Sequence, residues 1–570
     1  MGHSDSGHGN YVLTKLMKHV SLPILMAASV LCAPLLHAQD ATIPATSSAP
    51  ATVAAPKPVP MPSPQVQDAG ERVLLATEAY NAGVAALNGG RWQDAITNLE
   101  RALSLSPDDA TAQKLRGYAY LKLGRNGDAL SALRLAERGQ TQLETGSRSD
   151  VQNYIGLALW NNREYSLSLA AYRNALKINS ANEEARYNLA FALLSIKQAR
   201  ESISQFTQLI AKTPRDASLH HGLGRAYESL GNWPKAIAAY RLAVTNAPNE
   251  YSYQLALGLA LVKSDPNGTI KNRWESAVAP LRAASSLAPN ESGAWLQMGL
   301  IYLNRKRWTE AQNAFQRYAA LNPTNFSGLF NLALSFDSAG KFDEALSAYG
   351  KASQVQPQSA AVQNNIGRVY FKRRDNERAI TYFRAALGLD ATFLDARNNL
   401  AIALGARGDD KAAATEWQKL IDSANATLRG IPTTGATSAQ KAQRAQIQNR
   451  VLAARAVLAE GFLKNNQHAE AAKQYREVMR LNPSNSAAQI NLGLSLYYLR
   501  DYAGALSTYD AILKREPNNA VAYNNRGVVL EAQKNKVAAF AAYKRAIELR
   551  PDYTDAKNNR DRLLSSTSIS

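Results

Sequence analysis

Apolar residues recur along most of this chain at intervals of three and four residues, the spacing that places them on one face of an α-helix. From residue 217 to 250, two such stretches are separated by a Gly-Asn pair and closed by Pro248, which removes a backbone donor and ends a helix. The pattern predicts two antiparallel amphipathic helices joined by a short turn. Small residues at Gly224 and Ala236 predict a close approach of the two helices, with Tyr240 filling the space beside them.

The same pattern recurs in a 34-residue frame. Thirteen copies start at residues 76, 110, 149, 183, 217, 251, 292, 326, 360, 394, 452, 486 and 520. The eighth residue is Gly in nine copies and Ala in four, and the twentieth is Ala in eleven copies and Ser in the other two, Ser168 and Ser202. A proline stands thirty-second in nine copies. These residue types at this period resemble the tetratricopeptide repeat. The resemblance implies an all-α fold, a right-handed α-solenoid of about thirteen helix-turn-helix repeats.

The chain divides into six predicted segments. They are a signal peptide (1–38), a Pro/Ala-rich linker (39–75), repeats one to ten (76–427), a basic insertion (428–451), repeats eleven to thirteen (452–553), and a capping helix with a tail (554–570). The insertion is expected to open with a Thr/Gly-rich loop at 430–438, to close with a helix at 439–450, and to divide the array into ten repeats and three. Shorter insertions are expected at 142–148 and at 264–268.

The first segment has the order of an export signal. Lys15 and Lys18 precede an apolar run at 24–33, and a small residue, Ala38, stands at the expected cleavage site. We therefore expect an exported protein of the periplasm or cell envelope with no membrane span in the mature chain. An uncleaved anchor is an alternative, and so is lipid attachment at Gly2 or at Cys32, the only cysteine.

No catalytic pattern is found in the sequence. The histidines of the mature chain, His220, His221 and His468, lack metal-ligand spacing, and no phosphate-binding loop, serine elbow or HExxH motif occurs. We therefore expect no enzyme activity, no metal and no cofactor. Aromatic residues at the start of each second helix, such as Trp233 and Trp274, are interpreted as packing residues rather than as a ligand cage.

The formal net charge of +19 favours anionic partners. Nucleic acid is not expected for an exported protein. Between residues 423 and 459 there are five basic residues and no acid, which fits either a solvated loop or an anionic docking site. The five are Arg429, Lys441, Arg444, Arg450 and Arg455.

The resemblance also implies a groove lined by the first helix of each pair. The sixth frame position carries Asn in seven copies, namely Asn81, Asn188, Asn331, Asn365, Asn399, Asn491 and Asn525. Related repeat proteins use such an amide ladder to hold the backbone of an extended peptide, whereas amides that bond within their own repeat are the alternative. The predicted main site lies in copies eight to ten, where Asn331, Asn365 and Asn399 are accompanied by Arg368, Lys372, Phe330 and Leu334. Tyr497 and Tyr498 are a predicted second contact.

These observations favour a non-catalytic scaffold of the bacterial cell envelope that binds extended peptide or protein partners, among them acidic ones. The alternative is a basic accessory factor that binds anionic cell-wall or exopolysaccharide polymers during their synthesis or export. Fold class is strongly specified by the repeat, whereas function is not.

Overall fold

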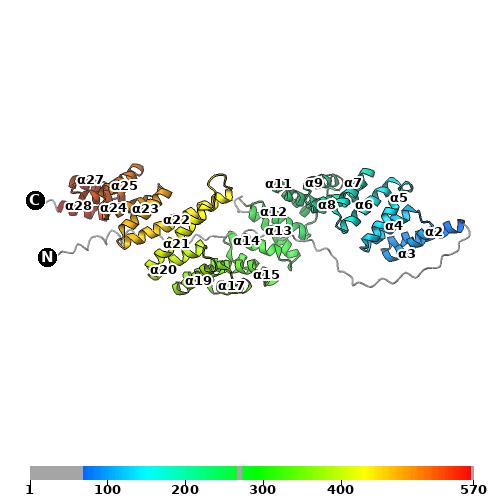
Figure 1. Cartoon of the computed structure of the whole chain (residues 1–570), viewed down its shortest axis with the longest axis horizontal. Helices are drawn as coiled ribbons and strands as arrows, with labels where there is room; N and C mark the ends of the chain where they lie inside the picture. Colours follow the sequence, from blue (N-terminus) through cyan, green and yellow to red (C-terminus); the bar gives the residue numbers. More distant parts are fainter. Residues whose placement is uncertain (1–68, 266–271, 566–570) are drawn as a thin grey trace. The chain divides into compact units, whose positions relative to one another are not determined.

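A computed structural model describes residues 69–265 and 272–565 of the chain, and every described element is a helix (Figure 1). The predicted signal peptide, most of the linker and the centre of the insertion in the sixth copy lie outside the described residues. The chain divides into two compact units between Ala339 and Gly340. Each unit is described by itself.

The amino-terminal unit contains the first helix pairs and the first helix of the eighth copy. Its helices are α2 (Ala69–Asn88), α3 (Trp92–Leu105), α4 (Ala110–Lys122), α5 (Asn126–Arg138), the 3-10 helix η2 (Gln140–Gln142), α6 (Thr145–Asn161), α7 (Tyr165–Ile178), α8 (Glu183–Ser195), α9 (Ala199–Lys212), α10 (Ala217–Ser229), α11 (Trp233–Asn246), α12 (Tyr251–Lys263), α13 (Arg273–Leu287), α14 (Gly293–Asn304), α15 (Trp308–Leu321) and α16 (Phe326–Ser338).

The carboxyl-terminal unit continues in the same way. Its helices are α17 (Phe342–Val355), α18 (Ala360–Lys372), α19 (Asn376–Leu389), α20 (Leu394–Arg407), α21 (Asp410–Arg429), α22 (Ser438–Lys464), α23 (His468–Leu481), α24 (Ser486–Tyr498), α25 (Tyr502–Arg515), α26 (Ala520–Ala532), α27 (Lys536–Leu549) and α28 (Thr554–Ser565). Within each unit every helix packs against the next one along the chain, which confirms the predicted helical-repeat fold.

Close packing inside each pair depends on the small eighth residue of the frame. A Cβ added to Gly224 would lie only 2.6 Å from Cδ1 of Tyr240, and one added to Gly527 would lie 2.6 Å from Cε1 of Tyr543. The partner is the twenty-fourth residue of the same copy in every case where the eighth is glycine. The predicted close approach of Gly224 and Tyr240 is therefore confirmed, and the side chain at position 24 occupies the space that the small residue leaves.

The turn inside each pair needs a left-handed residue at frame position 15. This residue is glycine in five copies: Gly90, Gly124, Gly231, Gly340 and Gly408. In the remaining copies it is Arg163, Lys197, Asn272, Lys306, Arg374, Asn466, Arg500 or Lys534, with φ between 57° and 65°. A left-handed backbone costs most residues with a Cβ roughly 1–2 kcal/mol, whereas Asn tolerates it better, so the fold imposes this conformation on the six Arg and Lys residues that do not favour it.

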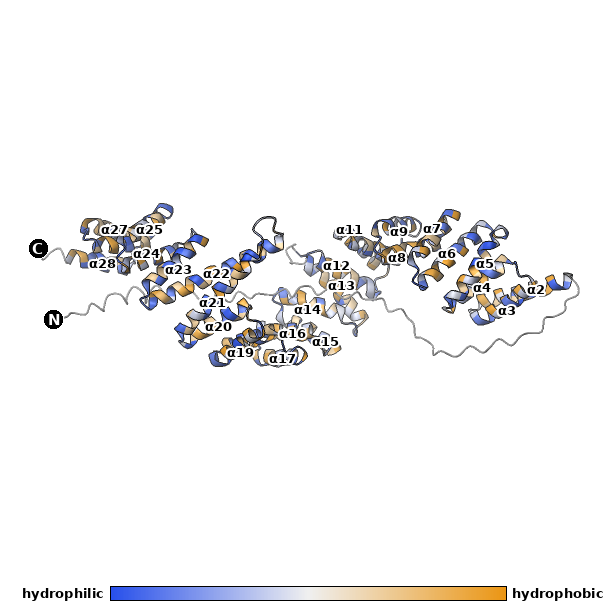
Figure 2. Cartoon of the chain, viewed as in Figure 1, coloured by the Kyte–Doolittle hydropathy of each residue, from blue (hydrophilic) through white to orange (hydrophobic). Residues whose placement is uncertain are grey.

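Many first helices begin at a side chain that accepts backbone N–H bonds. Asp216 accepts from the amides of Ser218 and Leu219, and Asn325 accepts from the amide of Gly328. Such caps satisfy donors that have no partner inside the helix. Figure 2 shows hydrophobic (orange) and hydrophilic (blue) residues together along the helices of both units.

Two predicted boundaries need correction. Helix α2 begins by Ala69, so the linker is shorter than predicted; the last proline is Pro64, and nothing after it prevents a helix. The helix predicted at 439–450 does not end there but continues into the first helix of the eleventh copy as α22. Its start is fixed by a capping box between Thr437 and Gln440.

The long insertion also does not separate the repeats on its two sides. Helices α21 and α22 pack against each other, and Ile431, Ile447 and Val451 of the insertion share a core with Trp417. The apolar residues of the insertion complete the surface between copies ten and eleven. The insertion therefore lies inside the carboxyl-terminal unit, and the chain divides instead between Ala339 and Gly340.

The carboxyl-terminal end of the array and the insertion at 142–148 agree with the predictions. The insertion at 142–148 forms η2 and an extra turn at the start of α6, and Gln142 accepts a bond from the amide of Ala110 at 3.2 Å. At the end of the array, α28 packs on α27 and buries Ala556 and Leu563 on its thin apolar side, as a capping helix should.

Candidate peptide-binding face

The first helices of successive pairs lie next to one another. Helix α4 contacts α6, α12 contacts α14, and α18 contacts α20, whereas contacts of this extent are not found between successive second helices of the described residues. The first helices therefore form the inner side of each stack. We call the surface of these helices that faces away from the second helices the first-helix face.

Asparagine amides connect neighbouring first helices on this face. Three bonds have this form: Asn188 Nδ2 to Asn153 Oδ1 at 2.9 Å, Asn399 Nδ2 to Asn364 Oδ1 at 2.9 Å, and Asn559 Nδ2 to Asn524 Oδ1 at 3.0 Å. In the first two, an amide at frame position 6 donates to an amide at position 5 of the preceding copy, and in the third, Asn559 of the capping helix α28 donates to the amide at position 5 of the last copy. Some amides of the predicted asparagine ladder therefore form hydrogen bonds between neighbouring repeats. The sequence-based prediction did not include such bonds.

The other predicted amides bond within or beside their own helix. Asn331 Nδ2 donates to Ser327 O at 2.9 Å, Asn365 Oδ1 accepts from Arg368 Nη1 at 2.9 Å, Asn491 Nδ2 donates to Tyr475 Oη at 3.1 Å, and Asn525 Oδ1 accepts from Asn524 Nδ2 at 3.2 Å. Asn81 is exposed on α2. Because an amide has two N–H donors and an acceptor oxygen, one internal bond does not use its full capacity. A peptide-binding role for these amides stays a prediction.

The predicted main site is divided between the two units. Phe330, Asn331 and Leu334 lie on α16 of the amino-terminal unit, whereas Asn365, Arg368 and Lys372 lie on α18, and Asn399 on α20, of the carboxyl-terminal unit. Phe330 stacks on Phe326 with ring centroids 5.6 Å apart. The convergence of the two sets on one ligand also stays a prediction.

Tyr497 and Tyr498 lie at the end of α24 and pack against aromatic neighbours. Tyr498 stacks on His468 with ring centroids 4.4 Å apart, and Tyr497 contacts Tyr502 at 6.0 Å. Burial raises the pKa of both tyrosine hydroxyls above its usual value. Both rings are half-buried, so each presents only part of its surface to a ligand.

The amino-terminal unit carries an apolar strip of which the sequence-based prediction included only one end. It consists of the residues at frame positions 5 and 9 of three successive first helices: Leu255 and Leu259 on α12, Leu296 and Leu300 on α14, and Phe330 and Leu334 on α16. All six are half-buried. The sequence does show apolar residues at positions 5 and 9 in three consecutive copies. They can be recognised as one strip only when it is known that these two positions share the first-helix face.

Earlier first helices carry aromatic residues at frame positions 5 and 9, namely Tyr187, Tyr118 and Phe191, and at position 6, namely Tyr154. Tyr118 and Tyr154 lie with ring centroids 5.1 Å apart, and Lys122 Nζ lies 5.0 Å from the centre of the Tyr118 ring. Tyr187 and Phe191 on α8 lie 4.6 Å apart. Burial, with Glu184 and Asp150 nearby, raises the pKa of Tyr154. The face thus carries aromatic residues on α4, α6 and α8, leucines on α12 and α14, and Phe330 with Leu334 on α16.

Aromatic residues at the start of the second helices mostly pack, as predicted. Trp274 is 7% exposed and its Nε1 donates to Asp265 O at 2.7 Å, and Trp233 and Trp308 pack against the same apolar core. Tyr165 differs, because it is 42% exposed while its ring contacts Trp160 at 4.7 Å.

Comparison with known proteins agrees with this geometry. The sequence matches the tetratricopeptide repeat at residues 80–142, 192–251, 330–393, 456–497 and 490–554, and a second form of the same repeat at residues 294–325. The chain belongs to the tetratricopeptide repeat family. No curated protein matches the sequence.

Several solved tetratricopeptide repeat structures are similar to parts of the chain. The carboxyl-terminal part of a repeat protein from Cytophaga hutchinsonii is 17% identical, covers 44% of this chain and 99% of its own, and has a TM-score of 0.39. YrrB, described as having an unusual peptide-binding site, is 20% identical, with coverage of 38% and 98% and a TM-score of 0.31. MamA from Desulfovibrio magneticus RS-1 is 24% identical, with coverage of 32% and 97% and a TM-score of 0.29. These scores support no inference about function.

Within residues 69–265 and 272–565, no cluster of three or more His, Cys, Asp or Glu side chains could hold a metal ion. No helix of these ranges is long and apolar enough to cross a membrane. The tetratricopeptide repeat fold is that of a protein–protein interaction scaffold.

Proposed function

We propose that this tetratricopeptide repeat protein is an exported, non-catalytic scaffold of the bacterial cell envelope, and that its first-helix face binds extended segments of partner proteins. The repeat array supports the scaffold role. The order of basic, apolar and small residues before Gln39 supports export.

The observation that carries the proposal is the apolar strip on α12, α14 and α16. Leu255, Leu296, Leu300 and Leu334 pack on the core with one side and expose the other. A leucine that only packed the core would be buried, as Leu257 and Leu261 on α12 are. A row of half-buried apolar side chains on adjacent helices matches a partner segment with apolar residues at regular intervals.

Site-specific photocross-linking in living cells tests this proposal. A photoreactive residue at Leu300 should capture a defined partner, whereas one at Leu242 should not. Leu242 is a matched control because it is also a leucine of the amino-terminal unit, lies on the second helix α11, and is 50% exposed. If capture depended on exposure alone, Leu242 would capture more than Leu300.

Equal capture at the two positions, or none at Leu300, would contradict binding on the first-helix face. Export is tested separately by sequencing the amino terminus of the protein recovered from the envelope, which we expect to begin at Gln39. A chain that keeps Met1 or Met17, or that remains in the cytoplasm, would refute the export proposal while leaving the binding result standing.

A further inference from the structure

The long insertion of the carboxyl-terminal unit forms a pocket that no ordinary repeat provides. The pocket has a volume of about 520 Å³ and lies between the end of α21, the loop that follows it, α22 and the end of α23. A volume of this size is typical of sites for small molecules. The α21–α22 loop is seen in Figure 1.

Four arginines and no acidic residue line this pocket: Arg429, Arg444, Arg455 and Arg480. The remaining lining is mainly aliphatic, with the amides of Asn425 and Gln448 and the hydroxyl of Thr433, and consists otherwise of Leu428, Ile431, Pro432, Val451 and Leu481. The other basic residues of the insertion do not take part. Arg450 pairs with Asp395 at 2.7 Å, and Lys441 is exposed outside the pocket.

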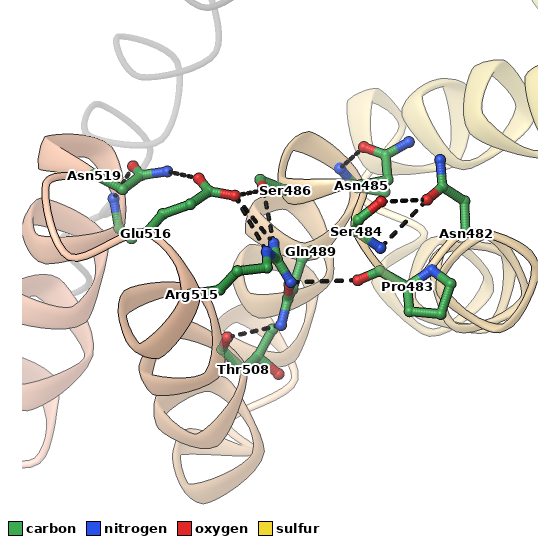
Figure 3. A network of polar contacts seen from close by, with 12 residues as sticks. Asn482, Pro483, Ser484, Asn485, Ser486, Gln489, Thr508, Arg515, Glu516 and Asn519 are labelled. Carbon is green, nitrogen blue, oxygen red and sulfur yellow. Dashed lines mark hydrogen bonds and ion pairs between the residues drawn. The ribbon is translucent and has the colours of Figure 1, made fainter.

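Arg455 has donors that its counterparts in other repeats use for the fold. In five other copies, the side chain at frame position 4 bonds the carbonyl oxygen six residues earlier, in the loop before its helix. This is so for Arg186 with Ser180 (2.7 Å), His220 with Pro214 (2.8 Å), Gln254 with Pro248 (2.8 Å), Trp295 with Pro289 (3.3 Å) and Arg397 with Ala391 (2.7 Å). In the twelfth copy, Arg515 donates to the corresponding carbonyl of Pro483 at 3.3 Å (Figure 3).

At Arg455 this loop carbonyl does not exist. The residue six positions earlier is Asn449, which lies inside the continuous helix α22, where carbonyls accept from the helix itself. Arg455 Nη1 donates to Gln474 Oε1 at 2.7 Å, as Arg186 and Arg397 do to the residue at the same frame position. The donor that Arg186 and Arg397 give to the loop carbonyl is Nη2, so at Arg455 this donor has no such acceptor. Nε of Arg455 is buried and has no hydrogen-bond partner among the described residues, as is also true of Nε of Arg397.

The other three arginines of the pocket differ in how many bonds their guanidinium groups make to the protein. Arg444 Nη1 donates to the carbonyls of Leu428 and Ile431 at 3.0 and 2.9 Å and so fixes the pocket wall. Arg480 pairs with Glu477 at 3.1 Å on the surface, where solvent weakens the pair. Arg429 is exposed and makes no hydrogen bond or ion pair within the described part of the chain. The pocket therefore keeps a strong positive potential and at least two guanidinium groups with unused donors.

We propose that this pocket binds a small phosphate monoester with a short aliphatic body. Guanidinium groups match the oxygens of a phosphate and hold its double negative charge. The aliphatic lining requires a ligand with an apolar part, and the absence of an aromatic ring among the lining residues disfavours a nucleotide base, which would need a stacking partner. The site is independent of the proposed peptide-binding face.

Titration calorimetry of the full exported chain at low salt tests the proposal with hexyl phosphate as the probe. Hexyl phosphate should bind at least about tenfold more tightly than inorganic phosphate, because the pocket also buries its alkyl chain. Arg429→Gln should weaken this binding roughly fivefold or more, since it removes one charged donor. Lys441→Gln removes the same charge from the same insertion outside the pocket and should change the affinity less than twofold.

The source of the phosphate is distinguished with phosphatidylcholine vesicles that contain phosphatidic acid. Vesicle binding that Arg429→Gln abolishes and Lys441→Gln preserves identifies a lipid headgroup as the ligand. Binding of hexyl phosphate without vesicle binding identifies a free metabolite. Equal affinities for hexyl and inorganic phosphate, or equal effects of the two substitutions, would overturn the proposal. Because neither the Arg429 nor the Lys441 side chain makes a hydrogen bond or ion pair within the described part of the chain, both variants are expected to remain folded, which circular dichroism checks.

Discussion

Replacing Gly367 by Ala should loosen the ninth repeat, although alanine is the better helix former. A Cβ at this position would lie 2.7 Å from Cε1 and 2.8 Å from Cδ1 of Phe383, and 3.2 Å from the backbone oxygen of Ala379. The ring and the facing helix must both move. Overpacking of this kind costs about 1–3 kcal/mol, and the gain in helix propensity returns about 1 kcal/mol. We expect a net loss of about 1 kcal/mol.

Gly350→Ala is the matched control for this substitution. Gly350 lies in the interior of α17 in the same unit, and an added Cβ there meets nothing within 4 Å. Only the gain in helix propensity remains, so the free energy of unfolding of this variant should rise by about 1 kcal/mol. The two identical substitutions should therefore change stability in opposite directions, by a difference of about 2 kcal/mol.

Hydrogen exchange followed by mass spectrometry measures the effect repeat by repeat. Unfolding of a repeat array is not a single two-state step, so a global midpoint would mix the local contributions. In Gly367→Ala, amides of α18 and α19 should exchange about fivefold faster, with smaller changes in α17 and α20 and none in α26 and α27. Uniformly faster exchange along the chain, or the same sign for both glycine variants, would refute the reasoning from local contacts.

Three further predictions follow from single contacts. Burial, and to a lesser extent the charge of Arg225, lowers the pKa of His221 from 6.5 to about 4. Because the folded state resists protonation, the stability of this repeat should fall as the pH drops from about 6.5 to 4, by at most about 3 kcal/mol, and hydrogen exchange of α10 and α11 in His221→Phe should lack this part of the pH dependence. Lys534→Gly should stabilise the last repeat by about 0.5–1 kcal/mol because φ is 63° there, whereas Lys544→Gly inside α27 should destabilise it by about 1 kcal/mol; equal effects on hydrogen exchange of α26 and α27 would contradict this. Asn399→Ala and Asn364→Ala should each lower the free energy of unfolding by about 1 kcal/mol, and the double variant should lower it by little more. Additive losses in a double-mutant cycle would show that the hydrogen bond between the two amides contributes nothing.

The repeat architecture could be predicted from the sequence because its decisive contacts are local. The residues at frame positions 8 and 24, such as Gly224 and Tyr240, are only 16 positions apart, and the turn between them has room for few conformations. A small residue facing a large one at a fixed period specifies the helix pair before any long-range contact is known. Similarly, the thin apolar side of residues 555–564 was sufficient to predict a capping helix.

Only the tertiary structure decided which side chains come together between repeats. The bond from Asn399 to Asn364 joins residues 35 positions apart, and its existence depends on how two first helices lie against each other. The insertion shows the same limit. Its basic residues were visible in the sequence, but the pairing of Arg450 with Asp395 and the position of Arg455 beside Arg429 depend on a helix that continues through a predicted repeat boundary. Charge and period are properties of the chain, whereas the satisfaction of each donor is a property of its neighbours in space.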